Sequence, residues 1–213
     1  MILRVLSFRP AEPTDAADRF VRDQVQPALL ACKGLRFLYF GRSSAQGQAS
    51  RVVITVWDDG DPECPSELDL SQQLDFEIAP EVLDPIVATY DARLVVVTDQ
   101  TEPARIIRLF RGTLHAGELD DFVRDSEAIT DSITDFKPHA VFVGSDPPEG
   151  IVALSVWPQW EGIVAATGGD VANPILTRNT QRLKSMFADH FELVPGTVAG
   201  PVGGRVTVFD KSA

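Results

Sequence analysis

An internal repeat constrains the fold of this chain more than any other feature of its sequence. The segments ILRVL (2–6) and FVRD (20–23) recur as IIRLF (106–110) and FVRD (122–125), about a hundred residues later. Three more pairs follow in the same order: 37–41 with 140–144, 53–57 with 153–157, and 93–97 with 205–209. Ordered matches of this kind predict a duplicated unit, although two coincidentally similar stretches would also produce them. We expect one repeat over residues 1–100 and the other over 101–213.

Each repeat has the pattern of a β-α-β-β-α-β unit. Apolar residues at helical spacing follow the first strand, and Pro27 predicts a kink or a second helix there. Two strands come next, over 36–42 and 51–57 in the first repeat and over 139–144 and 150–157 in the second. In the second repeat, Asn173-Pro174 and a stripe of apolar residues predict a closing helix that ends near His190. This order is typical of the α+β class, with helices on one face of an antiparallel sheet.

The predicted strands are apolar on both faces. Leu3 and Val5 alternate with Ile2 and Leu6 on the first strand, and residues 37–40 are all apolar or aromatic. Strands of this kind are buried on both sides. A single sheet with helices on one face would leave its other face bare, so we expect the two sheets to pack against each other.

The composition excludes several classes of partner. A formal charge of −12 argues against nucleic-acid binding, which needs a basic surface. Apolar runs are far shorter than the roughly 18 residues that span a bilayer, so we expect no membrane partner and a cytoplasmic location. Cys32 and Cys64 form no disulfide framework, and the spacing of the three histidines predicts no metal site.

The element order, the split first helix and the endings ITVWDD and LSVWPQ resemble the antibiotic-biosynthesis monooxygenase (ABM-like) group of dimeric α+β barrels. In that group two chains pair their ferredoxin-like sheets face to face, so a tandem chain would form an intrachain pseudo-dimer, with a further homodimer left open. The resemblance implies a cofactor-independent monooxygenase acting on a small apolar or aromatic ligand. The residues of the haem-degrading branch find no match here. A non-catalytic stress-response or ligand-sensing barrel is the alternative.

Five side chains are candidates for the site. Arg4 and Arg108 occupy equivalent positions in apolar strands, where a guanidinium can orient an anion or form a structural ion pair. Tyr39 is replaced by Phe142 in the second repeat, which favours the first repeat as the half that keeps a working hydroxyl. We therefore expect Tyr39 and Arg4 to be catalytic, in a pocket between sheet and helices of the first repeat. The expected substrate-binding residues are Trp57, Arg108 and Trp157, although packing alone would also explain both tryptophans.

Overall fold

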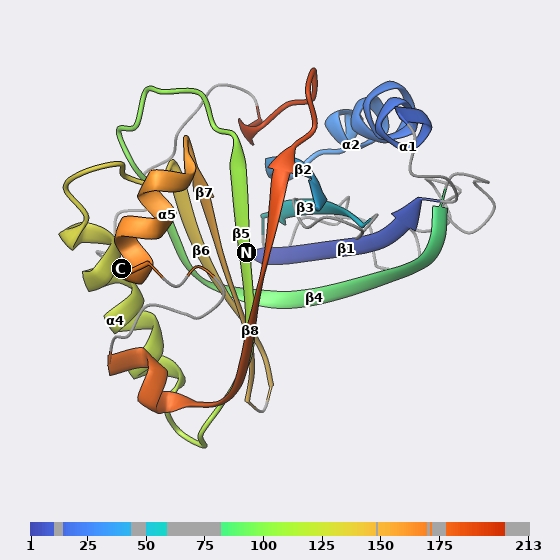
Figure 1. Cartoon of the computed structure of the whole chain (residues 1–213). Helices are drawn as coiled ribbons and strands as arrows, with labels where there is room; N and C mark the ends of the chain where they lie inside the picture. The colour runs from blue at the N-terminus through green and yellow to red at the C-terminus, as the bar shows by residue number, and fades with distance from the viewer. Residues whose placement is uncertain are drawn as a thin grey trace. The chain divides into compact units, whose positions relative to one another are not determined.

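The computed structural model describes residues 1–10, 15–43, 50–58, 82–147, 149–169, 171 and 178–202. These residues fall into two units. Unit 1 comprises Met1–Thr89 and Phe191–Arg205, and unit 2 comprises Tyr90–His190 (Figure 1). The units therefore do not divide the chain at a single point.

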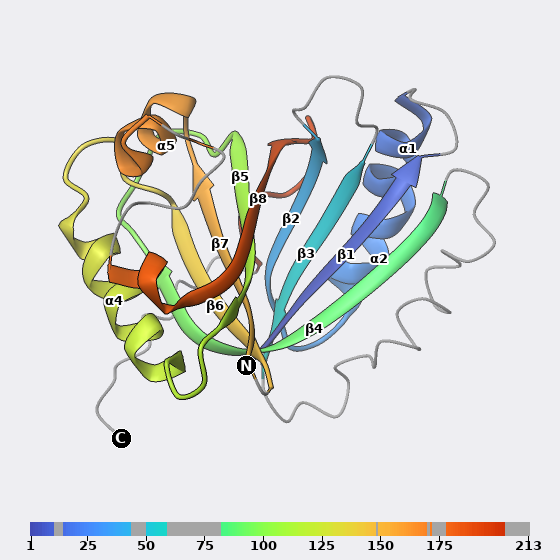
Figure 2. The same cartoon turned by 60° about the horizontal axis from the view of Figure 1, so that its bottom comes forward.

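The sheet of unit 1 is built around β3 (Arg51–Trp57), which pairs antiparallel with β1 (Ile2–Pro10) and with β2 (Leu35–Ser43). Figure 2 shows these strands side by side. The first part of β4 (Val82–Val97) flanks β1 on the outside. Most residues of β1 and β2 are buried whichever face they lie on, which confirms the expectation from their apolar pattern.

The helical segment of unit 1 is split, as predicted. It consists of α1 (Asp15–Phe20), a π-helical turn η1 (Val21–Val25) and α2 (Gln26–Ala31), with Pro27 in the first turn of α2. A proline is tolerated there because that amide has no partner inside the helix. The segment packs one apolar stripe onto the sheet, in a buried cluster that includes Phe20, Val21, Val25, Leu29, Leu6, Phe8, Leu38 and Trp57.

Unit 2 repeats this arrangement. The central strand β7 (Gly150–Trp157) pairs antiparallel with β5 (Ile106–Leu114) and β6 (Ala140–Asp146). Ile106 pairs with Trp157, just as Ile2 pairs with Trp57 in unit 1. The segments that match in sequence thus occupy the same strand register in both units.

Two strands contribute to both units. Residues of β4 up to Thr89 belong to unit 1, whereas its later residues belong to unit 2 and pair with β6. In β8 (Leu183–Leu193), residues up to His190 belong to unit 2, and the last three pair with β2 of unit 1. The short β9 (Gly200–Pro201) also pairs with β2. Unit 1 is therefore completed by residues that follow unit 2 in the sequence, and the sheet of unit 2 includes the second part of a strand that begins in unit 1.

Two helices cover one face of the unit 2 sheet, α4 (Leu119–Ser132) and α5 (Trp160–Thr167) (Figures 1 and 2). The predicted helix is wrong over residues 178–190, because a 3-10 turn η2 (Arg178–Arg182) is followed by strand β8. Its expected start at Asn173-Pro174 lies outside the described residues. Three of the apolar residues that suggested one helical stripe, Leu183, Met186 and Phe187, are divided between the two faces of β8, and the fourth, Leu176, lies outside the described residues. Met186 and Phe187 remain 36% and 52% exposed, while Leu183 packs against the core.

The α+β class with an antiparallel sheet is confirmed. The predicted closing strand 205–209 and the second helix of the first repeat lie outside the described residues. The division of the repeats at residue 100 and the face-to-face packing of their sheets stay predictions. Within the described part of the chain, no helix has the length and apolar character needed to cross a bilayer.

Candidate functional site

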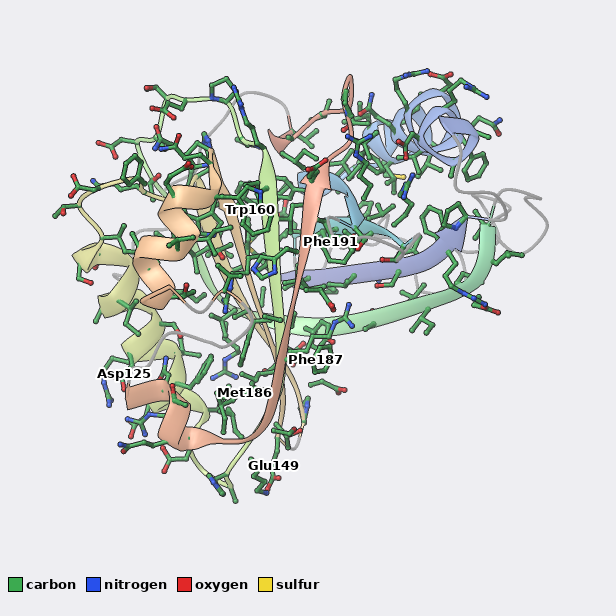
Figure 3. The ribbon with its side chains drawn as sticks, viewed as in Figure 1. Asp125, Glu149, Trp160, Met186, Phe187 and Phe191 are labelled. Atoms are coloured by element: carbon green, nitrogen blue, oxygen red, sulfur yellow. The ribbon has the colours of Figure 1, made fainter. Side chains whose placement is uncertain are left out.

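A pocket lies between the sheet and the helices of unit 2. Its empty volume is about 770 Å³, counting the space open to solvent at its mouth. Figure 3 labels Trp160 on α5 and Asp125 on α4, which mark the two helices beside it. The strands contribute Arg108, Phe110, Val141, Val143, Ala153, Leu154, Ser155 and Trp157. The rest of the lining comes from α4, α5, η2, Ile133, Pro138 and Leu183, mostly through apolar side chains. Such a concave apolar site with a few polar groups is typical of small-molecule binding.

Arg108 provides the positive charge of this pocket. It lies in the middle of β5, directly opposite Ser155 on β7, and is only 8% exposed. Burial lowers the pKa of the Arg108 guanidinium to about 10, because the charged form loses hydration. The guanidinium remains charged at neutral pH, and an anion in the pocket would offset part of this desolvation.

Trp157 and Ser155 form a hydrogen-bonded pair on the floor of the pocket. The indole Nε1 of Trp157 donates to Ser155 Oγ over 2.8 Å. Both side chains point to the helix-covered face, because alternate residues of a strand share a face and Trp157 packs against Ile163 of α5. The floor therefore presents a cation, a hydroxyl group and an aromatic surface together.

The helical wall opposite is held by hydrogen bonds within and between its elements. Asn179 of η2 donates from Nδ2 to the Phe122 carbonyl oxygen at 3.2 Å and to Ser126 Oγ at 3.1 Å. Arg182 of η2 forms ion pairs with Glu118, Asp121 and Asp125 of α4, the last over 3.0 Å. These bonds attach η2 to α4 and so position the part of the pocket wall that η2 contributes.

His190 packs against Trp160 and lies within the electrostatic influence of Arg108. Their ring centroids are 5.1 Å apart, with the rings tilted by 44°. Burial, together with the nearby charge of Arg108, lowers the pKa of His190 to about 4. His190 is therefore neutral at neutral pH. Among the described residues, no group of three or more histidine, cysteine or carboxylate side chains has the arrangement of a metal site.

The structure separates the two residues expected to be catalytic. Arg4 pairs across strands with Thr55, on the helix-covered face of unit 1, and its guanidinium carbon lies 5.9 Å from the Trp57 ring centroid. Tyr39 pairs with Ile54 and so lies on the opposite face of the same sheet. Burial raises the pKa of the Tyr39 phenol well above its usual value. These two side chains therefore do not share a pocket.

The three residues expected to bind substrate also do not lie in one place. Arg108 and Trp157 both line the pocket of unit 2, whereas Trp57 is completely buried in the core of unit 1. Sequence reasoning missed Ser155 and Asn179. A signal for Ser155 existed, because VITVW and ALSVW both place a hydroxyl residue two positions before the tryptophan. Thr55 accepts the same bond from Trp57 Nε1 at 2.8 Å.

Comparison with known proteins gives structural matches only. No protein-family model matches the chain, and no curated protein does either. A candidate monooxygenase from Lactobacillus acidophilus aligns at a TM-score of 0.67 and 13% identity, covering 94% of this chain and 98% of its own. An anthrone oxidase-like protein aligns at a TM-score of 0.57 and 11% identity, covering 95% of this chain and 94% of its own.

A ferredoxin-fold protein from Listeria monocytogenes, related to antibiotic-biosynthesis monooxygenases, aligns at a TM-score of 0.51 and 8% identity, covering 91% of this chain and 94% of its own. At these identities the likeness concerns the fold. The chain has the ferredoxin-like α+β fold found in proteins related to the antibiotic-biosynthesis monooxygenases.

Proposed function

We propose that the pocket of unit 2 binds a small aromatic molecule and catalyses its oxygenation by dioxygen without a bound cofactor. The observation that carries the proposal is the buried Arg108 guanidinium in an otherwise apolar pocket. The fold supports this proposal, since a candidate monooxygenase and an anthrone oxidase-like protein share it.

The reaction requires a substrate that can supply all the electrons. A ring methylene group that lies between two aromatic rings and opposite a carbonyl group of the same ring loses a proton to solvent and forms an enolate. The enolate carbon adds dioxygen, and protonation of the product gives a hydroperoxide. Loss of water then leaves a new carbonyl group at that carbon. One dioxygen is consumed, one of its oxygen atoms enters the product, and the other leaves as water.

Arg108 would stabilise the enolate oxygen. A fixed cation in a site with little water favours a developing negative charge more strongly than bulk solvent does. The same interaction lowers the pKa of the bound substrate, so that water or hydroxide can remove its proton. Trp157 would contact the aromatic ring of the substrate.

Oxygen consumption with anthrone as the probe tests the proposal. We expect the wild-type chain to consume dioxygen in the presence of a chelator and without added flavin or haem. Arg108→Met should reduce the rate at least about 100-fold, by analogy with the removal of one oxyanion-stabilising donor. Arg111→Met on the same strand, facing away from the pocket, is the matched control. A rate that depends on added flavin, haem or metal would contradict the proposal.

Arg4→Met tests the hypothesis drawn from the sequence in the same assay. If this variant loses activity and Arg108→Met keeps it, the reaction belongs to the first repeat, and the expected role of Arg4 is supported.

A second candidate function is ligand binding without catalysis. The described residues that line the pocket include no carboxylate, histidine, lysine or cysteine that could act as a base. This lining suits a sensing module as well as an enzyme whose substrate loses its proton to solvent. Calorimetric binding of anthrone without oxygen consumption would favour the sensing module.

A further inference from the structure

Three hydroxyl groups on the helical wall of the pocket already use their hydrogen atoms. Ser126 Oγ donates to the Phe122 carbonyl oxygen, Thr130 Oγ1 to that of Ser126, and Thr167 Oγ1 to that of Ile163, each over 2.8 Å. A serine or threonine hydroxyl has only one hydrogen atom to donate. These three residues therefore offer a ligand only lone pairs.

Ser155 is bonded in the opposite sense. Its Oγ accepts a hydrogen bond from Trp157 Nε1, so its own hydrogen atom is not used by that bond. The residue lies on the floor of the pocket, paired across strands with Arg108. Ser155 and Arg108 thus place hydrogen-bond donors on the strands, whereas the hydroxyl groups of Ser126 and Thr130 on α4 and of Thr167 on α5 present acceptors.

From this polarity, and on the basis of the ligand pocket proposed above, we infer that Ser155 is a specificity-determining residue. Together with Arg108 it forms a two-donor site for an oxygen that carries negative charge, such as a carboxylate, phenolate or enolate oxygen. An aromatic ligand would enter with this oxygen toward the strands and its apolar part toward α4 and α5. A ligand without an acceptor oxygen would leave the Ser155 hydrogen unpaired and bind more weakly.

Trp157 acts as a positioning residue in this arrangement. Its indole N–H occupies a lone pair of Ser155 Oγ, which directs the hydroxyl hydrogen away from the indole and toward the pocket. The hydrogen bond from the indole also polarises the Ser155 hydroxyl, which strengthens the hydrogen bond that this hydroxyl would donate to a ligand.

Binding of two matched probes tests the inference. We choose 2-naphthoate, which carries a carboxylate, and naphthalene, which has the same rings and no oxygen, and measure both affinities by calorimetry without turnover. The wild-type chain should prefer 2-naphthoate. Ser155→Ala should weaken 2-naphthoate binding about tenfold, the equivalent of one hydrogen bond to a charged group, and change naphthalene binding less than about twofold.

Two control variants separate donation from packing. Ser155→Thr keeps a hydroxyl group at the position where the first repeat has Thr55, and should restore the preference for 2-naphthoate. Thr55→Val removes the equivalent hydroxyl in unit 1 and should change neither affinity. An equal loss for both probes in Ser155→Ala, an unchanged preference, or no binding of either probe to the wild-type chain would overturn the inference.

The outcome is distinguishable from that of the proposed reaction. Selective binding of 2-naphthoate without oxygen consumption would support the two-donor site and contradict the monooxygenase proposal. If the chain oxidises anthrone but Ser155→Ala leaves both probe affinities unchanged, the monooxygenase proposal is supported and the two-donor site is contradicted.

Discussion

At the scale of single residues, the helix-facing strand positions of the two units carry similar side chains in different surroundings. Arg4, Thr55 and Trp57 in unit 1 correspond in register to Arg108, Ser155 and Trp157 in unit 2. In unit 1 the tryptophan is packed against the helical segment, whereas in unit 2 it lines a pocket.

His190 should make the stability of the protein depend on pH. Its pKa is about 4 in the folded chain, compared with an ordinary value of 6.5, because burial and Arg108 disfavour the charged ring. The unfolded chain binds the proton more tightly, so this stability is fully present above about pH 6.5 and is lost as the pH falls through about 4. Allowing for solvent screening, we expect a loss of about 1 kcal/mol between pH 7 and pH 5.

Urea unfolding near the two pH values measures this effect. His190→Gln should remove that part of the pH dependence, and His115→Gln, at an exposed position, should leave it in place. Identical pH dependence in His190→Gln and the wild-type chain would show that the ring titrates normally.

Gly162 allows the loop after α4 to pack against the pocket wall. A Cβ atom at this position would lie 2.7 Å from the Phe136 carbonyl oxygen and 2.8 Å from a ring carbon of Trp157. Phe136 itself has a positive φ of 52°, a strained conformation for a bulky residue. Backbone and a buried ring leave no room for a methyl group without displacement of the loop or of Trp157.

Gly162→Ala should therefore lower the free energy of unfolding by about 1–3 kcal/mol, despite the better helix propensity of alanine. It should also weaken probe binding, because Trp157 would move. Val164→Ala on the exposed side of the same helix is the control, with a change within about 0.5 kcal/mol. A higher free energy of unfolding in Gly162→Ala would contradict the prediction, because it would show that the loop at Phe136 moves without cost.

At the scale of elements, an ion-pair cluster attaches α1 to its sheet. Asp18 on α1 accepts a hydrogen bond of 2.6 Å from Arg51 Nε on β3, and both side chains are almost buried, at 12% and 11% exposure. Arg42 on β2 lies 3.9 Å from the same carboxylate and pairs with Glu192 at 3.1 Å. Removing the Asp18 charge would leave Arg51 buried without its partner.

Asp18→Asn should lower the free energy of unfolding by about 2–4 kcal/mol, as expected when one member of a buried pair is lost. Arg9→Gln removes an exposed ion pair with Asp84 and should change stability by less than about 1 kcal/mol. Chemical denaturation of both variants gives the comparison. An equal loss of unfolding free energy in the two variants would contradict the prediction, because it would show that the Asp18–Arg51 pair contributes no more than an exposed ion pair.

Element prediction from the sequence succeeded where the pattern had one interpretation. Residues 52–56 are five consecutive β-branched side chains, and the predicted strand over 51–57 has the bounds of β3. The spacing of Leu183, Met186, Phe187 and His190 fits a helix, yet these residues form a strand, because pairing with β5 outweighs local propensity.

The candidate site could be predicted only in part for a related reason. Alternation within a strand could not place Tyr39 and Arg4 on opposite faces, because that depends on the register of β1 and β2 with β3, which only the structure gives. The side chains of Asn179 and Ser126 meet through contacts 53 residues apart in the sequence, which no local pattern indicates. The pocket itself is lined by residues from 108 to 183, which only the tertiary fold brings together.

At the scale of the whole molecule, the repeats are not independent segments. Unit 1 includes Phe191 and the residues after it, and unit 2 includes the end of β4. A cut within residues 98–105 would deprive each half of a strand segment that it needs. We expect fragments 1–100 and 101–213 to lack cooperative unfolding when each is alone, and to regain it when mixed.

Circular dichroism during urea unfolding measures the cooperativity of the fragments. The matched control is the intact chain with a protease site in the same linker, which is cut after folding. Its unfolding curve should match that of the mixed fragments. A fragment 1–100 that folds cooperatively by itself would contradict the prediction.

The strands that serve both units also carry a thermodynamic consequence. If opening β4 or β8 breaks ladders in both units, the slowest amide exchange in β1–β3 reports global unfolding rather than events in unit 1 alone. A ligand that touches only unit 2, present at about 100 times its Kd, would then slow that exchange about 100-fold. The exchange rates of amides in unit 1 would thus report whether a ligand occupies the pocket of unit 2, although these residues do not line it.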